Sequence, residues 1–245
     1  MVCTIKENQD GFTLVEISIV MIIIGLLIGG TFGGMKLIEN MQVNRTVQDL
    51  KAIESAALTF KDTYGRLPGD IANPAARLPN CTIAPCSTGG NGDRRLDSSV
   101  GHYAAITATN ERFTFWHHLQ SANLLSMGYR NTTDLSFGEG QPDTPIGGGY
   151  RMTSYTGPVL AGCDTQIAGG VVTIASDSSA GFGTSSTLSC AALASIDTKM
   201  DDGFPQSGRA TNFGTAGCLL SPLACDTAYD RAGTPIYAFG YDASF

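Results

Sequence analysis

Residues 11–16 read GFTLVE, and the nineteen residues that follow, 17–35, contain no charged side chain. A helix over residues 17–35 rises about 28 Å at roughly 1.5 Å per residue, close to the ~30 Å hydrocarbon core of a bilayer. Glu16 stands directly before this apolar run, where a lone carboxylate is costly and usually has a partner. The sequence therefore predicts a membrane helix that begins with a carboxylate in need of a partner.

The residues that carry a family resemblance here are Gly11, Phe12, Leu14, Val15 and Glu16. The segment resembles the N-terminus of type IV pilins and of the pseudopilins of type II secretion. This resemblance implies that a prepilin peptidase cleaves after Gly11 and methylates the new N-terminal Phe12. It also implies that Glu16 pairs with the free amine of a neighbouring subunit in an assembled filament.

An ordinary signal anchor with a chance glutamate is the simplest alternative for this segment. Charges inside membranes are rare and functional by default, which favours the prepilin interpretation. A cleaved secretory signal fits poorly, because such a signal has a basic first region, a shorter apolar core and a small-x-small cleavage site. Residues 1–10 carry one Lys, one Glu and one Asp, so the leader is also less basic than is usual in the family.

The helix is expected to continue beyond the membrane as an amphipathic segment. Its apolar positions, at spacings of three and four, are Leu50, Ile53, Ala57, Phe60 and Tyr64. This spacing places them on one face of a helix. Gly65 directly follows and is suited to cap the helix, while Pro68 prevents its return. We expect a leader at residues 1–11, a pilin helix at 12–64 with about 17–38 in the membrane, and a globular head at 65–245.

Two glycine pairs interrupt the membrane half of this helix: Gly29-Gly30 and Gly33-Gly34. Each glycine costs about 1 kcal/mol relative to alanine in a helix interior. Small residues allow a neighbouring helix to approach closely. The same glycines would alternatively act as a hinge that unwinds when the subunit leaves the bilayer, and both interpretations stay open.

The head contains shorter elements in an α+β arrangement. Helices are predicted at residues 110–127 and 188–200, and strands at 150–160, 171–175 and 236–241. Asn110 is suited to cap the first helix, in which His117 and His118 are expected at exposed or edge positions. Together with the long helix, these elements predict a pilin-like fold: a small antiparallel sheet packed on the N-terminal helix, with disulfide-tied loops.

Six cysteines lie beyond the membrane helix: Cys81, Cys86, Cys163, Cys190, Cys218 and Cys225. An even set in an exported domain predicts three disulfides, although six cysteines allow fifteen pairings. Proximity along the chain favours Cys81–Cys86 and Cys218–Cys225, which leaves Cys163–Cys190. Zinc is disfavoured, because the Cys-x4-Cys and Cys-x6-Cys spacings are unusual for zinc and adjacent histidines cannot face one ion on a helix.

Two acidic loops are weak candidates for calcium, and we expect no other cofactor or metal. Their residues are Asn91, Asp93 and Asp97 in the first loop and Asp197, Asp201 and Asp202 in the second. Calcium takes six to eight oxygen ligands, and neither loop has the ordered spacing of an EF-hand. Asp and Asn also stabilise turns through their own side chains, so turn formation is the favoured interpretation.

Composition argues against several classes of function. The chain has 245 residues and a net charge of −7, whereas nucleic-acid binding relies on Lys and Arg that neutralise phosphates, so no nucleic-acid partner is expected. The basic pair Arg94-Arg95 is flanked by Asp93 and Asp97 and is predicted to be solvated surface. Motifs of serine hydrolases, phosphate-binding loops and zinc proteases are absent from the sequence, so no enzymatic activity is expected.

The sequence thus predicts a structural pilin-like subunit, assembled into a type IV pilus or a type II secretion pseudopilus, and its large head suggests a minor component. Its expected partners are other pilin subunits, the prepilin peptidase, the inner-membrane assembly platform and membrane lipid. It would cross the inner membrane once before assembly and then form a periplasmic or cell-surface filament. The alternative is a single-pass adhesin or sensor that does not polymerise.

Overall fold

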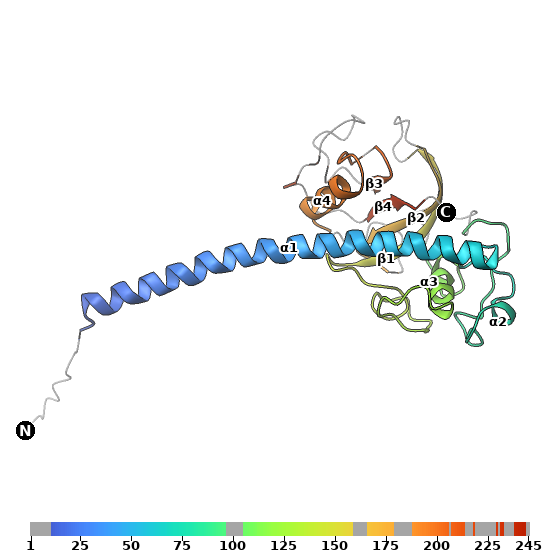
Figure 1. Cartoon of the computed structure of the whole chain (residues 1–245), viewed down its shortest axis with the longest axis horizontal. Helices are drawn as coiled ribbons and strands as arrows, with labels where there is room; N and C mark the ends of the chain where they lie inside the picture. The colour runs from blue at the N-terminus through green and yellow to red at the C-terminus, as the bar shows by residue number, and fades with distance from the viewer. Residues whose placement is uncertain are drawn as a thin grey trace, which may run out of the picture. The chain divides into compact units, whose positions relative to one another are not determined.

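The computed structural model describes residues 11–96, 105–158, 166–178, 188–205, 207–213, 218, 229, 231–232 and 238–243. The chain divides into two compact units, residues 1–41 and residues 42–245. The helix α1 (Leu14–Tyr64) contributes its first part to one unit and its second part to the other. The short helix α2 (Pro74–Arg77), the helices α3 (Glu111–Ser121) and α4 (Cys190–Met200), and a sheet complete the second unit (Figure 1).

The helix α1 confirms the predicted long N-terminal helix, and its 51 residues change surroundings at residue 42. All residues from 14 to 41 are exposed, whereas beyond them a buried face recurs every three to four residues. The buried residues of that face are Val43, Thr46, Val47, Leu50, Ile53, Ala56, Ala57 and Phe60. The helix ends as predicted at Gly65, whose left-handed φ of 70° lets its N–H donate to the Lys61 carbonyl at 2.8 Å.

The sheet is antiparallel and has the strand order β1-β2-β4-β3. The strands are β1 (Gly149–Pro158), β2 (Gln166–Ala175), β3 (Ala210–Phe213) and β4 (Ala238–Asp242). The α+β prediction and the three predicted strands are confirmed with shifted ends, and β3 is an additional strand. In the register, Tyr150 of β1 faces Ile174 of β2, and Val172 of β2 faces Tyr241 of β4.

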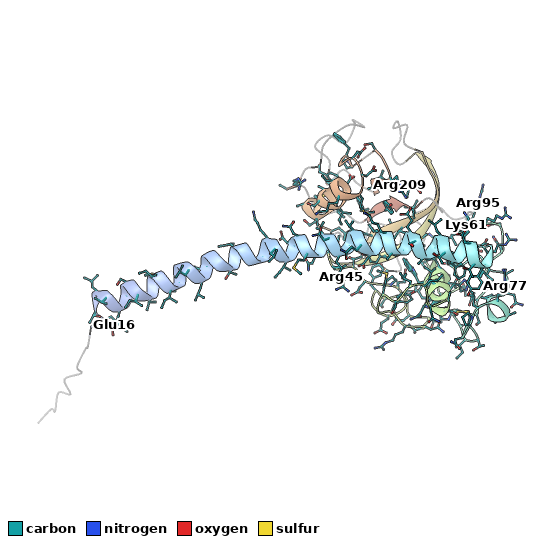
Figure 2. The ribbon with its side chains drawn as sticks, in the orientation of Figure 1. Glu16, Arg45, Lys61, Arg77, Arg95 and Arg209 are labelled. Carbon is teal, nitrogen blue, oxygen red and sulfur yellow. A yellow bond between two sulfur atoms is a disulfide. The ribbon has the colours of Figure 1, made fainter. Side chains whose placement is uncertain are left out.

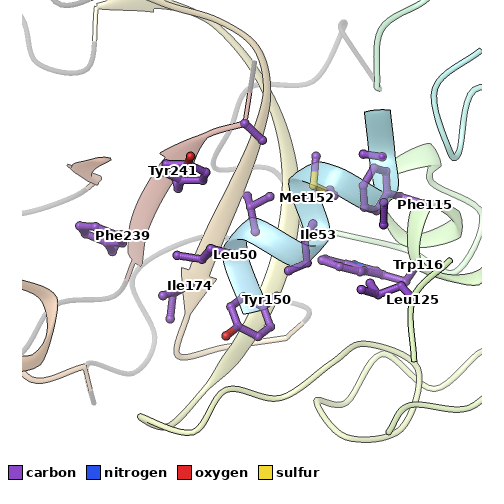
Figure 3. Close-up of a cluster of buried hydrophobic side chains, with 14 of the residues drawn as sticks. Leu50, Ile53, Phe115, Trp116, Leu125, Tyr150, Met152, Ile174, Phe239 and Tyr241 are labelled. Atoms are coloured by element: carbon purple, nitrogen blue, oxygen red, sulfur yellow. The ribbon is translucent and has the colours of Figure 1, made fainter. Parts of the chain in front are cut away.

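The core of the head forms where the second part of α1 meets the sheet and α3. Figure 3 shows Leu50 and Ile53 of α1 between Ile174 of β2 and Trp116 of α3, and all four are fully buried. Burial of such side chains is worth about 1.5–3 kcal/mol each. A hydrogen bond also links the sheet to α1, since the hydroxyl of Tyr241 in β4 donates to Oε2 of Glu54 in α1 at 3.0 Å.

The helix α3 is shorter than the predicted 110–127 segment. Asn123 adopts a left-handed φ of 55°, its N–H donates to the Gln120 carbonyl, and the Leu124 N–H donates to the Leu119 carbonyl. This pair of bonds is a Schellman motif, which ends a helix. Residues 111–119 are all buried, so the prediction that His117 and His118 are exposed is wrong. The element is enclosed on every side rather than amphipathic.

Two disulfides lie among the described residues, and one of them was predicted. Cys81–Cys86 is confirmed, with an S–S distance of 1.98 Å. The other joins Cys190, the first residue of α4, to Cys218 with a Cα–Cα distance of 5.4 Å, so the predicted pairs Cys218–Cys225 and Cys163–Cys190 are wrong. Cys163 and Cys225 lie outside the described residues.

Candidate functional site

The candidate site lies at the start of α1, where three residues precede the first helical turn. Gly11, Phe12 and Thr13 are non-helical and exposed, and α1 begins at Leu14. Phe12 is 84% exposed, and no heavy atom lies within 4 Å of the position that a Cβ on Gly11 would occupy. The peptide bond between Gly11 and Phe12 is therefore open on the surface of the single chain.

Glu16 has a partner in its own chain that the sequence reasoning missed. Its Oε2 accepts hydrogen bonds from the Thr13 backbone N–H at 2.9 Å and from the Thr13 hydroxyl at 2.8 Å. The Thr13 Oγ1 in turn accepts from the Glu16 N–H at 3.3 Å. The two residues form a capping box, which satisfies otherwise unpaired N–H groups at the helix start. The Thr-x-x-Glu spacing was the signal that could have found it.

The first part of α1 is apolar on all sides. By length and composition, α1 is the single helix of the described residues that is able to cross a membrane. Its exposed large side chains include Ile17, Ile19, Val20, Met21, Ile22, Ile23, Ile24, Leu26, Leu27, Ile28 and Phe32. A helix that is hydrophobic all round fits a membrane anchor.

Residues 6–32 match the family described as the prokaryotic N-terminal methylation motif. The chain carries a prepilin-type methylation motif. No curated protein and no solved structure is significantly similar to the chain. The resemblance to the N-terminus of type IV pilins and pseudopilins is therefore confirmed for this segment, and Gly11, Phe12 and Glu16 all lie within it.

The first calcium candidate is a loop held by buried carboxylates. Asn91 and Asp93 contact each other, since the Asp93 N–H donates to Asn91 Oδ1 at 2.9 Å, while Asp97 lies outside the described residues. Asp70 and Glu111 approach Asp93 closely enough for one oxygen of each to lie within 4.8 Å of the others. Glu111 Oε1 accepts the Asn91 N–H at 2.7 Å, so this carboxylate also stabilises the loop. Calcium at this loop stays a prediction.

The second calcium candidate lies at the end of α4. Carboxylate oxygens of Asp197, Asp201 and Asp202 lie within 4.8 Å of one another, and backbone N–H groups bind each residue. Burial raises the pKa of Asp197 to about 7, and the hydrogen bond from the Gly203 N–H partly opposes that shift. The arrangement supports turn formation, and calcium binding here too stays a prediction.

The ring nitrogens of His118 and the sulfurs of the nearby cysteines are bonded to other groups of the protein. His118 Nδ1 accepts the Gly69 N–H at 2.8 Å, and its Nε2 donates to the Cys86 carbonyl at 2.9 Å, so both ring nitrogens are used. The sulfurs of Cys81 and Cys86 are bonded to each other. Burial lowers the pKa of His118 to about 4 and that of His117 to about 3, so both rings are neutral near pH 7.

Proposed function

We propose that this protein is a structural subunit of a type IV pilus or a type II secretion pseudopilus, assembled after cleavage between Gly11 and Phe12. The observation that carries the proposal is the coincidence, within the methylation motif, of an open Gly11–Phe12 bond with Glu16 at the start of an all-apolar helix. The proposed partners are the prepilin peptidase, other subunits and the assembly platform of the inner membrane. The proposed destination is a periplasmic or cell-surface filament.

The chemistry of the site supports two uses of Glu16. In the single chain its carboxylate caps its own helix through Thr13. Cleavage creates an ammonium group on Phe12, and the Phe12 ammonium of a neighbour would give Glu16 an oppositely charged partner, whereas the donors that Thr13 supplies carry no charge. In a filament, the apolar helices would exclude water around that pair. A receptor that stays alone has no use for such a pairing, but it still benefits from the cap.

Two variants separate the cap from the charge. Glu16→Gln keeps a side-chain acceptor for the Thr13 N–H but removes the charge, and Glu16→Ala removes both. Glu39→Gln is the matched control, because Glu39 is an exposed carboxylate on the same helix. The measurement is the amount of the protein in filaments sheared from cells, together with the N-terminal mass of the protein in the membrane fraction.

We expect Glu16→Gln and Glu16→Ala to be cleaved after Gly11 and inserted in the membrane, yet both should be depleted from filaments, while Glu39→Gln assembles normally. Normal assembly of Glu16→Gln would show that the cap suffices and would remove the charge-pairing role. Normal assembly of both Glu16 variants would show that neither the charge nor the cap is needed, and absence of the parent protein itself from sheared filaments would favour the single-pass adhesin or sensor. An intact Met1 terminus in the parent protein, with the peptidase present, would contradict processing itself.

A further inference from the structure

A basic hollow of about 480 Å³ lies at the C-terminal end of α1, inside the head unit. Its lining consists of Lys61, Asp62, Gly65, Arg66, Leu67 and Arg94. Three of these side chains are cations and one is a carboxylate. Figure 2 shows Lys61, Arg77 and Arg95 around this end of the helix. Positive charge is concentrated in this part of the chain. Residues 61–95 contain five Lys and Arg and three Asp, a net charge of +2, whereas the whole chain has a net charge of −7.

Hydrogen bonds position two of the basic residues, Arg66 through its side chain and Arg94 through its backbone. Arg66 Nη1 donates to the Gly92 carbonyl at 2.7 Å. Arg94 adopts a left-handed φ of 68°, which is unfavourable for a side chain other than Gly, Asn or Asp. Its N–H donates to Asp70 Oδ2 at 2.8 Å, and Asp70 is fully buried. Such backbone strain persists only where the surroundings enforce it, and it is enriched at binding sites.

A surface with an exposed carboxylate and an exposed aromatic ring lies near the other end of the part of α1 that belongs to the head. After α4, Asp202 is exposed and Phe204 is 43% exposed. Lys199 Nζ donates to Asn44 Oδ1 at 2.8 Å, so the end of α4 lies beside the first turns of α1 within the head. Asn44 and Lys61 are seventeen residues apart on α1, which corresponds to about 26 Å along the helix axis.

We propose that the turn Asp202–Phe204 of a second copy of this chain binds in the hollow formed by Lys61, Arg66 and Arg94. The Asp202 carboxylate would accept charge-assisted hydrogen bonds from the basic side chains, and the Phe204 ring would lie against a guanidinium. Because the two surfaces are different and lie at opposite ends of the head, the contact is heterologous, and the proposed filament requires that its rotation does not close into a ring. Repetition of such a contact produces an open filament. The inference rests on the proposed function and names the contact between its heads.

The test is a charge exchange in the full-length protein. Lys61→Glu with Arg94→Glu reverses the hollow, Asp202→Lys reverses the turn, and the three changes combined restore opposite charges. Phe204→Ala tests the turn without changing charge. Arg130→Glu is the control, since Arg130 is exposed, pairs with Glu139 at 3.5 Å and does not line the hollow. The measurement is incorporation into sheared filaments, with Trp116 fluorescence as the check that the head is folded.

We expect the reversed hollow, the reversed turn and Phe204→Ala each to lower incorporation about tenfold or more, while the combined variant recovers most of it and Arg130→Glu has no effect. Loss without recovery in a folded combined variant overturns the second copy as occupant and points to a different acidic subunit. Normal assembly of the reversed hollow also overturns the inference. If Glu16→Gln is depleted while the hollow variants assemble, only this inference fails; absence of the parent protein from sheared filaments removes the proposed function as well.

Discussion

The two parts of α1 have the same secondary structure and opposite surroundings. From Leu14 to Met41 every residue is exposed in the single chain, and the apolar side chains cover all sides of the helix. Beyond Gln42 only one face is apolar, and that face is buried in the head. The first part holds five glycines at residues 25–34, and the second part holds none. One helix therefore carries two kinds of surface: one part is apolar all round and fits a membrane anchor, and the other part is buried along one face in a protein core.

The largest expected difference between the two parts comes from core truncation. Leu50→Ala should destabilise the head by about 2–5 kcal/mol, because Leu50 is fully buried and its removal leaves a cavity. Leu26→Ala makes the same chemical change at a side chain that is 72% exposed in the single chain, and the stability of the head should not change. Denaturant unfolding of detergent-solubilised protein, followed by the fluorescence of Trp116, measures both variants. Equal losses would show that the two parts do not unfold separately.

A smaller difference concerns pH, because the buried ionisable groups with strongly shifted pKa values belong to the head. Asp197 has a pKa raised to about 7, so the folded head binds that proton more tightly than the unfolded chain. Its contribution to the free energy of unfolding is full below about pH 4 and is lost as the pH rises to about 7. Since one pKa unit corresponds to about 1.4 kcal/mol before solvent screening, we expect a loss on the order of 2 kcal/mol.

Asp197→Asn should remove this loss in the free energy of unfolding between about pH 4 and about pH 7. His117 and His118 have lowered pKa values and act in the opposite direction, so they reduce stability as the pH falls below about 6.5. The difference between the parent and Asp197→Asn isolates Asp197, because both proteins retain the histidines. Thermal unfolding between pH 4 and pH 8 measures that difference. Parallel profiles for the two proteins would contradict the raised pKa.

The smallest expected effect concerns the glycines of the first part. No heavy atom of the chain lies within 4 Å of a Cβ added at Gly30 or Gly33, so alanine fits there and should stabilise the helix by about 1 kcal/mol per site. Circular dichroism of the protein in micelles should show the gain as resistance to melting of the helix. Impaired assembly of Gly30→Ala with Gly33→Ala would favour either close packing of neighbouring helices or unwinding. Normal assembly of this double variant would contradict both roles of the glycines.

The sequence was a good guide wherever the pattern is local. The spacing of Leu50, Ile53 and Phe60 defined the buried face of α1, and Gly65 marked its end. The β-branched run at residues 171–175 marked β2. The short strand β3 carries no comparable pattern, since its four residues read ATNF and pair with β4. The capping box of Thr13 and Glu16 could also have been predicted, because the Thr-x-x-Glu spacing is present in the sequence.

Contacts between segments that are far apart in the sequence could not be predicted from local patterns. Chain proximity suggested Cys218–Cys225, yet the cost of closing a loop grows only slowly with its length. The 28-residue separation of Cys190 and Cys218 was therefore no obstacle once α4 packed in the core. The burial of His118 likewise depends on partners at Gly69 and Cys86, which are distant in the sequence. Periodicity within residues 110–127 carries no information about them.

The division of the chain at residue 42 also has a practical consequence for making the head in water. A polypeptide that begins at Gln42 would retain the buried face of α1 and leave behind the apolar surface that requires detergent. One that begins after Tyr64 would expose the sheet residues Tyr150 and Ile174 and α3's Trp116, which contribute to the same core as α1. An uncovered apolar surface of that kind promotes aggregation. We therefore expect the head to stay soluble only while residues 42–64 of α1, twenty-three in number, cover its core. The other part of the same helix is suited to lipid.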